Sequence, residues 1–365
     1  MANTQSRIII ISDAWHPQVN GVVRIIERTM AELENRGFTC QVIGPDQFKT
    51  IPAPTYPEIR LALAPYGKLK RLLRDLPRMP TNIHIATEGP LGWAARRYCL
   101  KHKIPFTTAY HTKFPEYVAA RAPIPMTWTY RLMRYFHDPS TSVKTHTPSV
   151  KALLETKGLK NVSVWYGGVD VELFQPREPI EIGLPRPLAI YVGRVAVEKN
   201  IEAFLDAEFA GSKLVVGGGP ALASLTKAYP HVTFVGAKHG EELARYYSTG
   251  DVFAFPSLTD TFGLVVVEAL ACGVPVAAYP VTGPSDILTG EPGGDKVGVL
   301  DDDLAKAMAQ ALTLDRRECR PFAMAYSWSA ATTQFLSHFP PAVPVGQAES
   351  TVPDTPVAVS AQERV

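Results

Sequence analysis

Residues 7–45 read RIIIISDAWHPQVNGVVRIIERTMAELENRGFTCQVIGP and predict a strand, a loop, a helix and a second strand, in that order. The four consecutive isoleucines favour a strand of a parallel sheet, because such strands are covered on both faces. After the loop at 13–21, apolar residues recur with the spacing of one helix face that ends near Gly37: Val22, Ile25, Ile26, Met30 and Leu33. A strand that leads through a helix into another strand is the unit of a parallel α/β fold.

The same alternation continues through the chain. We expect further strands at 82–87, 104–111 and 161–166, and helices at 91–102, 127–137 and 149–157. A proline-rich link at 176–187 interrupts the pattern. Five strand-and-turn signatures follow the link: LAIYVGR (188–194), KLVVGGGP (213–220), HVTFVGA (231–237), DVFAFPS (251–257) and VPVAAYP (274–280). Two doubly wound sheets are therefore predicted.

The chain is long enough for two domains, because 365 residues with 46% hydrophobic residues supply two cores of ordinary size. We predict two facing Rossmann-like domains at 1–170 and 171–320, with a helix at about 321–338 packing back on the first domain. The tail at 339–365 is expected to be disordered. Ligands of open α/β sheets bind beyond the carboxyl ends of the strands, so the loops of both domains are expected to border one donor cleft.

Cysteine usage and the N-terminus favour a cytoplasmic chain. The four cysteines lie far apart and form no CxxC pair, so neither a zinc site nor a disulfide framework is predicted: Cys40, Cys99, Cys272 and Cys319. The apolar run at 8–11 is too short for a signal sequence or a membrane span.

Charge is divided unequally along the chain. Residues 1–168 contain 23 Lys and Arg against 11 Asp and Glu, and residues 169–365 contain 14 against 24, although the net charge is only +2. A basic half suits an anionic partner such as a membrane surface or nucleic acid. Two domains that attract each other across a cleft would explain the same asymmetry. No RRM, KH or helix-turn-helix pattern is present, so we expect no nucleic-acid partner.

Two stretches of the second half carry side chains suited to a nucleotide sugar. YVGRVAVEKN (191–200) places Arg194 after a strand and Lys199 near a helix start, where both suit diphosphate oxygens. A pair of surface cations is the alternative reading. DTFGLVVVEALACGVPV (260–276) places Asp260 and Glu268 around a Phe-Gly turn that opens a helix, whose first amides form an anion site. Without further context, these carboxylates would be a helix cap and a solvated face.

These motifs resemble the donor-site signature of the large family of retaining glycosyltransferases with the GT-B fold, which includes GDP-mannose-dependent α-mannosyltransferases. Segments of the first half are similar to the branch that glycosylates diacylglycerol and phosphatidylinositol-type acceptors: DAWHPQVNGVV (13–23), TEGPLG (87–92), AYHTKFPEY (109–117) and WYGGVDVELF (165–174). The resemblance extends to about residue 336.

The resemblance implies a role for each matching position. Arg194 and Lys199 are expected to bind the diphosphate, and Glu268 the ribose. The transferred sugar is expected to contact Asp260, where many relatives have Glu, and three backbone amides, those of Phe262, Gly263 and Leu264.

In the first half, the resemblance implies that Gly21 approaches the phosphates and that His111 reaches the sugar near the reacting face. A lone histidine at a strand end is otherwise more often structural. The resemblance also implies front-face displacement with retention, catalysed by His111, Arg194, Lys199 and Asp260 mainly through positioning and charge stabilisation. Neither a metal nor a cofactor besides the donor is expected.

The acceptor is suggested by IRLALAPYGKLKRLLRDLPR (59–78), a basic amphipathic stretch of the kind that lies on anionic bilayers. The alternative is that its leucines are core and its cations a solvated face. We expect transfer of a hexose or hexuronic acid from a UDP-sugar to a membrane lipid, diacylglycerol first, by an enzyme on the inner face of the cytoplasmic membrane.

Two other functions compete with this expectation. One is a GDP-mannose-dependent α-mannosyltransferase that acts on a soluble or polyprenyl-linked sugar. The other is a dinucleotide-dependent oxidoreductase, which is disfavoured because neither glycine run has the GxGxxG spacing.

Overall fold

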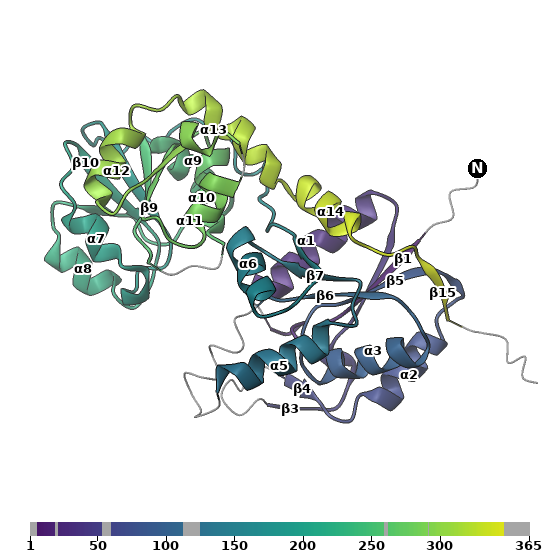
Figure 1. Ribbon diagram of the computed structural model, residues 1–365. Helices are drawn as coiled ribbons and strands as arrows, with labels where there is room; N and C mark the ends of the chain where they lie inside the picture. Colours follow the sequence, from purple (N-terminus) through teal and green to yellow (C-terminus); the bar gives the residue numbers. More distant parts are fainter. Residues whose placement is uncertain are drawn as a thin grey trace, which may run out of the picture.

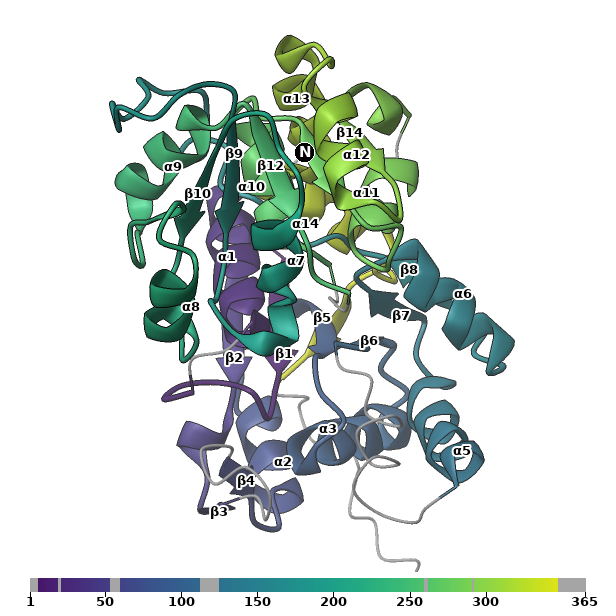
Figure 2. The ribbon, with the colours of Figure 1, turned by 90° about the vertical axis from the view of Figure 1, so that its left-hand side faces the viewer.

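The computed structural model describes residues 6–18, 21–52, 60–111, 125–258, 262–290 and 292–346. Its strands form two large, mainly parallel sheets and one small hairpin. Figures 1 and 2 show the two sheets in separate units that lie one above the other, each flanked by helices. The predicted α/β class with two Rossmann-like units is confirmed.

The N-terminal sheet has the order β2-β1-β5-β6-β7-β8. Its strands are β1 (Arg7–Ile11), β2 (Thr39–Ile43), β5 (Met79–Ile85), β6 (Phe106–Ala109), β7 (Ser142–Thr145) and β8 (Val162–Val164). Its helices are α1 (Gly21–Asn35), α2 (Tyr66–Arg74), α3 (Pro90–Lys101), α5 (Met126–His137) and α6 (Pro148–Thr156). A hairpin of β3 (Thr50–Pro52) and β4 (Arg60–Ala62) lies beside the sheet.

Alternate residues of β1 pack on opposite faces of this sheet, as the period of two in a strand requires. Ile9 and Ile11 pack with α2 and α3, whereas Ile8 and Ile10 pack with α1 and with the late helix α14 (Trp328–Ser337). The isoleucine run is therefore buried on both sides, as its sequence predicts.

The C-terminal sheet has the order β11-β10-β9-β12-β13-β14. Its strands are β9 (Leu188–Val192), β10 (Ser212–Val216), β11 (Thr233–Phe234), β12 (Val252–Phe255), β13 (Val276–Ala278) and β14 (Gly298–Leu300). Its helices are α7 (Ile201–Asp206), α8 (Leu222–Ala228), α9 (Gly240–Thr249), α10 (Leu264–Ala271), α11 (Pro284–Gly290), α12 (Leu304–Ala311) and α13 (Arg316–Ala323). The change of direction between β9 and β12 is where such sheets bind ligands.

The chain crosses between the two units twice, and the crossings touch. The amide of Val169 donates to the Tyr326 carbonyl (2.8 Å), and the amide of Trp328 donates to the Val169 carbonyl (3.3 Å). The expected helix at 321–338 is two helices. α13 packs on α10 in the C-terminal unit, whereas α14 packs on α1. The break falls at Ser327, whose side chain caps α14 by accepting from the Ala330 amide, because a serine at this place starts a new helix.

Part of the tail expected to be disordered is ordered. β15 (Val343–Val345) pairs antiparallel with Met79–Thr81 of β5. The start of β5 leaves backbone groups open beyond its neighbours, and Val345 is 3% exposed once paired. The expectation of disorder was therefore wrong for these residues, and 347–365 lie outside the described residues.

No helix in the described part of the chain is both long and apolar enough to cross a bilayer.

Candidate functional site

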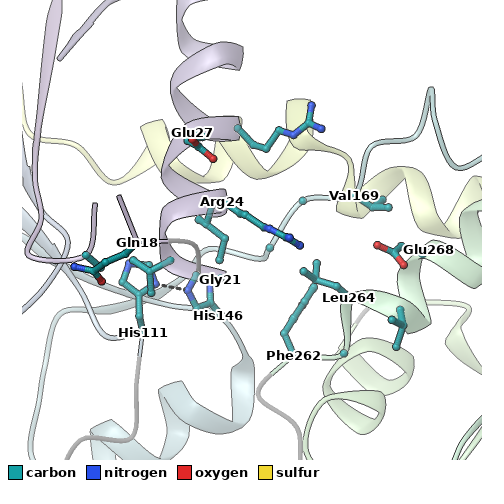
Figure 3. A pocket seen from close by; sticks show the side chains of 18 of the residues that line it. Gln18, Gly21, Arg24, Glu27, His111, His146, Val169, Phe262, Leu264 and Glu268 are labelled. Carbon is teal, nitrogen blue, oxygen red and sulfur yellow. Dashed lines mark hydrogen bonds between the residues drawn. The ribbon is translucent and has the colours of Figure 1, made fainter. Parts of the chain in front are cut away.

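The loops of both units border one cleft of about 1430 Å³. The N-terminal unit contributes the β1–α1 loop, the start of α1 and the residues that follow β6 and β7. The C-terminal unit contributes the loop after β9 and the start of α10. Figure 3 shows Arg24 of α1 extending toward Glu268 of α10 across this space. Of the nine predicted site residues, all except Asp260 are described, and all eight line the cleft.

The start of α10 has the geometry expected for an anion site. Gly263 has φ +84° and precedes the helix, a conformation that favours glycine. Phe262 packs beneath it and is 6% exposed. Leu264 and Val265 at the start of α10 line the cleft, whereas the amide of Val266 donates to the Gly263 carbonyl (2.9 Å). Asp260 lies outside the described residues, so its predicted sugar contact stays a prediction.

Glu268 is held from below by a tyrosine. The buried Tyr247 hydroxyl of α9 donates a hydrogen bond to Glu268 Oε2 (2.8 Å). Burial raises the pKa of the Glu268 carboxyl to about 6, an effect that the Tyr247 hydrogen bond and the charge of Arg24 oppose. The second carboxylate oxygen can accept from a ligand.

Arg194 and Lys199 lie on the loop that follows β9. The Tyr191 hydroxyl donates to the Arg194 carbonyl (2.8 Å), which fixes the start of this loop. Asn200, in a left-handed conformation with φ +50°, donates from its side chain to the Pro256 carbonyl (3.0 Å) and fixes the loop's end. Both cations border the cleft on the side of α10.

The triple glycine of KLVVGGGP does not approach the cleft. A Cβ at Gly217 would lie 1.8 Å from the Gly193 carbonyl oxygen, and one at Gly219 would lie 2.3 Å from that of Val195. These glycines allow the loops after β9 and β10 to pack backbone against backbone. Their role is to support the Arg194 loop.

The opposite wall of the cleft is the start of α1. Gly21 is the first residue of α1, and a Cβ added to it would have no atom within 4 Å. The preceding loop is anchored by Asp13, which is 5% exposed and accepts from the amides of Leu91 (2.9 Å) and Gly92 (3.3 Å) at the start of α3. The cleft therefore lies between two helix N-termini, those of α1 and α10, which both favour anions.

His111 lies in the same wall, just after β6. Its Nδ1 is 2.6 Å from Nε2 of His146, which follows the neighbouring strand β7, and Figure 3 shows this contact. His146 Nδ1 is 3.0 Å from the Trp165 carbonyl oxygen. Burial, His146 and His84 together hold the pKa of His111 well below its usual value.

The cleft lining from the N-terminal unit also includes the apolar side chains of Leu61, Trp93 and Leu132. In α2 the leucines of the basic stretch at 59–78 are core residues, as the alternative reading predicts, and the membrane role of its cations stays a prediction. Leu69 and Leu73 are fully buried, and the cations are exposed: Lys68, Lys70, Arg71 and Arg74.

Exposed apolar side chains occur on α5 instead. Trp128 is 69% exposed and Tyr135 64%, and Met126 and Leu132 are also exposed. Figures 1 and 2 place α2 and α5 at the same end of the molecule, away from the C-terminal sheet.

Three site residues escaped the sequence reasoning. Tyr247 and Arg24 have no motif of their own: Tyr247 contacts Glu268 from α9, and Arg24 lies in the first turn of α1. His146 could have been found had strand β7 been recognised, because two neighbouring parallel strands would then each be followed by a histidine. Strand β7 was not predicted because its sequence, SVKT, is polar.

Two family models match the chain. "Glycosyltransferase Family 4" matches residues 19–173, and "Glycosyl transferases group 1" matches residues 186–314. Each model covers one of the two units that border the cleft.

Relatives that match most of the chain are also found. A GDP-mannose-dependent alpha-mannosyltransferase of Mycobacterium tuberculosis is 29% identical, covering 91% of this chain and 96% of its own. An alpha-monoglucosyldiacylglycerol synthase of Streptococcus pneumoniae is 27% identical over 75% of this chain and 71% of its own. Among solved structures, the sucrose-phosphate synthase of Thermosynechococcus elongatus shares the fold, with a TM-score of 0.64, 22% identity, and coverage of 91% of this chain and 97% of its own.

Proposed function

Since this chain belongs to the group 1, family 4 glycosyltransferases with the GT-B fold and is a retaining hexosyltransferase, we propose that it transfers a hexose or hexuronic acid from a UDP-sugar to a membrane lipid, with diacylglycerol as the first candidate. In this proposal residues 1–170, together with α14, form the acceptor-side domain. Residues 171–320 form the donor domain.

The observation that carries the donor part is the convergence of positive groups on one cleft. The N-termini of α1 and α10 border it from opposite sides, and Arg194 and Lys199 lie on the adjoining loop. Helix N-termini and cations both stabilise phosphate charge. The diphosphate is therefore proposed to lie between Gly21 and Leu264, with the ribose hydroxyls donating to Glu268.

The reaction proposed for this placement is the front-face displacement that the family resemblance implies. The bond between the anomeric carbon and the phosphate oxygen breaks, and an acceptor hydroxyl oxygen bonds to the same face of that carbon. The departing phosphate takes the hydroxyl proton. Arg194, Lys199 and the helix amides stabilise the negative charge that develops on the leaving diphosphate, so the protein contributes mainly position and charge.

Two features support a lipid acceptor. The N-terminal unit contributes apolar side chains to the cleft lining, among them Leu61, Trp93 and Leu132. At the end of the molecule that carries α2 and α5, exposed cations of α2 accompany exposed aromatic side chains of α5, including Trp128 and Tyr135. Cations together with aromatic side chains are the combination that binds an anionic bilayer surface.

A GDP-mannose donor is the second candidate. The relative that matches 91% of this chain is named as a GDP-mannose-dependent alpha-mannosyltransferase. A soluble or polyprenyl-linked sugar acceptor belongs to the same alternative, and only with a soluble acceptor would α5 have no bilayer to bind.

A donor screen tests the proposal. Purified protein is incubated with anionic liposomes that contain diacylglycerol and with UDP-glucose, UDP-galactose, UDP-glucuronate or GDP-mannose in turn, and lipid products are identified by mass spectrometry. A glycosylated diacylglycerol from a UDP-sugar is the expected result. Turnover of GDP-mannose alone would assign the donor of the second candidate, and the acceptor would then be sought among soluble and polyprenyl-linked sugars.

A matched pair of variants tests the membrane part. Trp128→Ser with Tyr135→Ser is expected to reduce sedimentation with anionic liposomes, because both side chains are exposed. Lys160→Ser, at an exposed site outside α2 and α5, is the control. Equal sedimentation of all three proteins would contradict the proposed lipid surface while leaving the donor site untouched.

A further inference from the structure

Helix α14 holds both chain crossings at the border of the cleft. Trp328, its first residue, lines the cleft together with Gly168 and Val169 of the first crossing. A Cβ at Gly168 would lie 2.3 Å from Cδ2 of Trp328, so the two crossings pack directly on each other there. Further along the helix, the Gln334 side chain accepts from the backbone amide of Tyr166 (3.0 Å). A shift of α14 would therefore move both crossings.

α14 is seated on the N-terminal sheet over a buried lysine. Val143 of β7 packs with α5 and α6, so its neighbour Lys144 points to the opposite face of the sheet, the face of α14. Its Nζ lies 5.2 Å from the ring centroid of Phe335 and 5.3 Å from that of Phe339. Lys144 is 1% exposed, and its Nζ has no hydrogen bond among the described residues. Aromatic rings attract a cation, but they do not replace all of the hydration that a buried ammonium loses.

No acidic side chain in the described surroundings compensates this ammonium. α14 contains no charged residue, and neither do β6 and β8, the strands on either side of β7. From β5, Lys144 faces His84, and burial together with the charge of Lys144 holds the pKa of His84 well below its usual value. The nearest charged groups of α1 are Arg36, which donates to the exposed side of α14, and its partner Glu32 (3.1 Å). His338, which follows α14, is exposed.

The seated and released forms of α14 therefore differ in the protons that they bind. Burial lowers the pKa of Lys144 to about 7, whereas a lysine in water keeps its proton up to about pH 10.4. A form in which α14 has left its seat and water reaches Nζ thus binds one more proton between these two values. By linkage, the ratio of the released to the seated form falls about tenfold for each pH unit of rise in that window, and it is constant below pH 7.

We propose that α14 and Lys144 form a proton-sensitive latch at the cleft: α14 leaves the N-terminal sheet with uptake of a proton by Lys144, and it returns when that proton is released. Opening frees the two crossings that Trp328 and Gln334 hold, so the cleft border is held most firmly at alkaline pH. The latch is independent of which sugar the protein transfers, and it opens while the sheet beneath it stays folded.

Amide hydrogen exchange of the whole protein without ligand measures this opening between pH 7 and 9. Exchange rates are divided by the intrinsic rates at each pH to give protection factors. The protection of α14 amides is expected to rise about tenfold per pH unit, and to stay below that of β1, whose amides exchange only when the sheet unfolds. Protection of α14 that equals that of β1, or that does not change with pH, would overturn the latch.

A matched pair of variants assigns the titration. Lys144→Met keeps the length of the side chain without its charge, so the protection of α14 is expected to be independent of pH and at least tenfold higher than wild type at pH 7. Lys213 of β10 is the control, because it also lies over a phenylalanine ring (Phe204, 5.8 Å) but its Nζ donates to the carbonyls of Leu205 and Ala207. Lys213→Met should leave the pH dependence of α14 unchanged. A pH dependence that persists in Lys144→Met would refute the role of Lys144.

A thiol placed beneath α14 gives a second measurement, which does not require Lys144→Met to fold. Ala331 is 1% exposed and packs in the same cluster as Phe335, between α14 and the sheet. Ala331→Cys is labelled with a thiol reagent, the labelled peptide is identified by mass spectrometry, and the rate is normalised to that of a free cysteine peptide at the same pH. The normalised rate is expected to fall about tenfold per pH unit between pH 7 and 9. A constant normalised rate would contradict the latch.

Discussion

At Glu268, burial and hydrogen bonding act on the carboxyl in opposite directions. Its pKa is raised to about 6, so the proposed ribose contact depends on pH. A protonated carboxyl is a poorer acceptor, and donor affinity should therefore be complete above pH 6 and be lost as the pH falls through it. Titration calorimetry with intact UDP-glucose between pH 5 and 8 measures this, since its phosphates have no second ionisation in that range.

Two variants make the assignment specific. Glu268→Gln is expected to bind at least tenfold more weakly at pH 7.5 and to lose the dependence near pH 6. Tyr247→Phe removes a hydrogen bond that lowers the pKa of Glu268, so the midpoint should move to higher pH. A midpoint that stays near 6 in Glu268→Gln would assign the titration to another group.

A substitution at Gly21 is expected to affect stability and donor affinity differently. A Cβ at this position meets no atom within 4 Å, and alanine favours helices more than glycine does. Gly21→Ala is therefore expected to keep or slightly raise the melting temperature. Donor affinity is expected to fall at least tenfold, because the methyl group occupies the space proposed for the phosphates. An unchanged affinity would show that the donor lies elsewhere.

The site residues that belong to sequence motifs could be predicted, whereas the residues that hold them in place could not. Arg194, Lys199 and Glu268 could be assigned to one cleft from the sequence, because each follows a strand end or a turn that the sequence pattern predicts. Tyr247 supports Glu268 from a different helix, 21 residues away. Such contacts depend on how helices pack on a sheet, which no local pattern encodes.

Among the elements, β7 is unusual in burying a lysine. Lys144 is 1% exposed, lies over the rings of Phe335 (5.2 Å) and Phe339 (5.3 Å), and has no hydrogen bond to its Nζ among the described residues. Burial lowers its pKa to about 7. The folded chain thus binds fewer protons than the unfolded chain between pH 7 and about 10.4, and Lys144 destabilises the fold most at low pH.

Lys144→Met should remove this cost. The variant is expected to unfold with a free energy on the order of 2–4 kcal/mol higher at pH 7, and the advantage should shrink as the pH rises toward 10. Urea denaturation at several pH values measures the difference. Lys160→Met, at an exposed site, is the control and should show no such trend. A constant difference across pH would mean that packing, rather than charge, sets the stability.

The contribution of β15 to stability can be measured with a pair of C-terminal truncations. Removal of 347–365 retains β15, whereas removal of 343–365 deletes it and uncovers the start of β5. The longer deletion is expected to lower the melting temperature by about 2–5 °C relative to the shorter one, through lost pairing and the burial of Val345. Equal melting temperatures would make the pairing dispensable.

Strong strands were predictable and weak ones were not. The isoleucine run of β1 and five strands of the C-terminal sheet, β9 to β13, have apolar sequences that stand out from their surroundings, whereas the three-residue β14 was missed. β7 and β15 are short, contain polar residues or proline, and become strands only because a neighbouring strand offers its edge. Their formation is a property of the sheet.

At the scale of the whole molecule, the two units are joined by more than the chain crossings. Asp286 of α11 accepts hydrogen bonds from the backbone amide (2.8 Å) and hydroxyl (2.6 Å) of Ser149 at the start of α6, in the other unit. Asp286 is 6% exposed. A carboxylate at a helix N-terminus is stabilising. If the two units separate, this contact breaks, and Asp286 and Ser149 are then hydrogen-bonded to water instead.

We expect this contact to hold the cleft at its present width. Asp286→Ala should shift the balance toward separated units by roughly 2–3 kcal/mol. Because donor groups come from both units, the value of kcat/KM should fall at least tenfold, and the radius of gyration measured by small-angle X-ray scattering should increase without ligand. Ser149→Ala removes one of the two hydrogen bonds and should have a smaller effect of the same sign. A variant that loses activity with an unchanged radius of gyration would place Asp286 in the chemistry of the cleft instead.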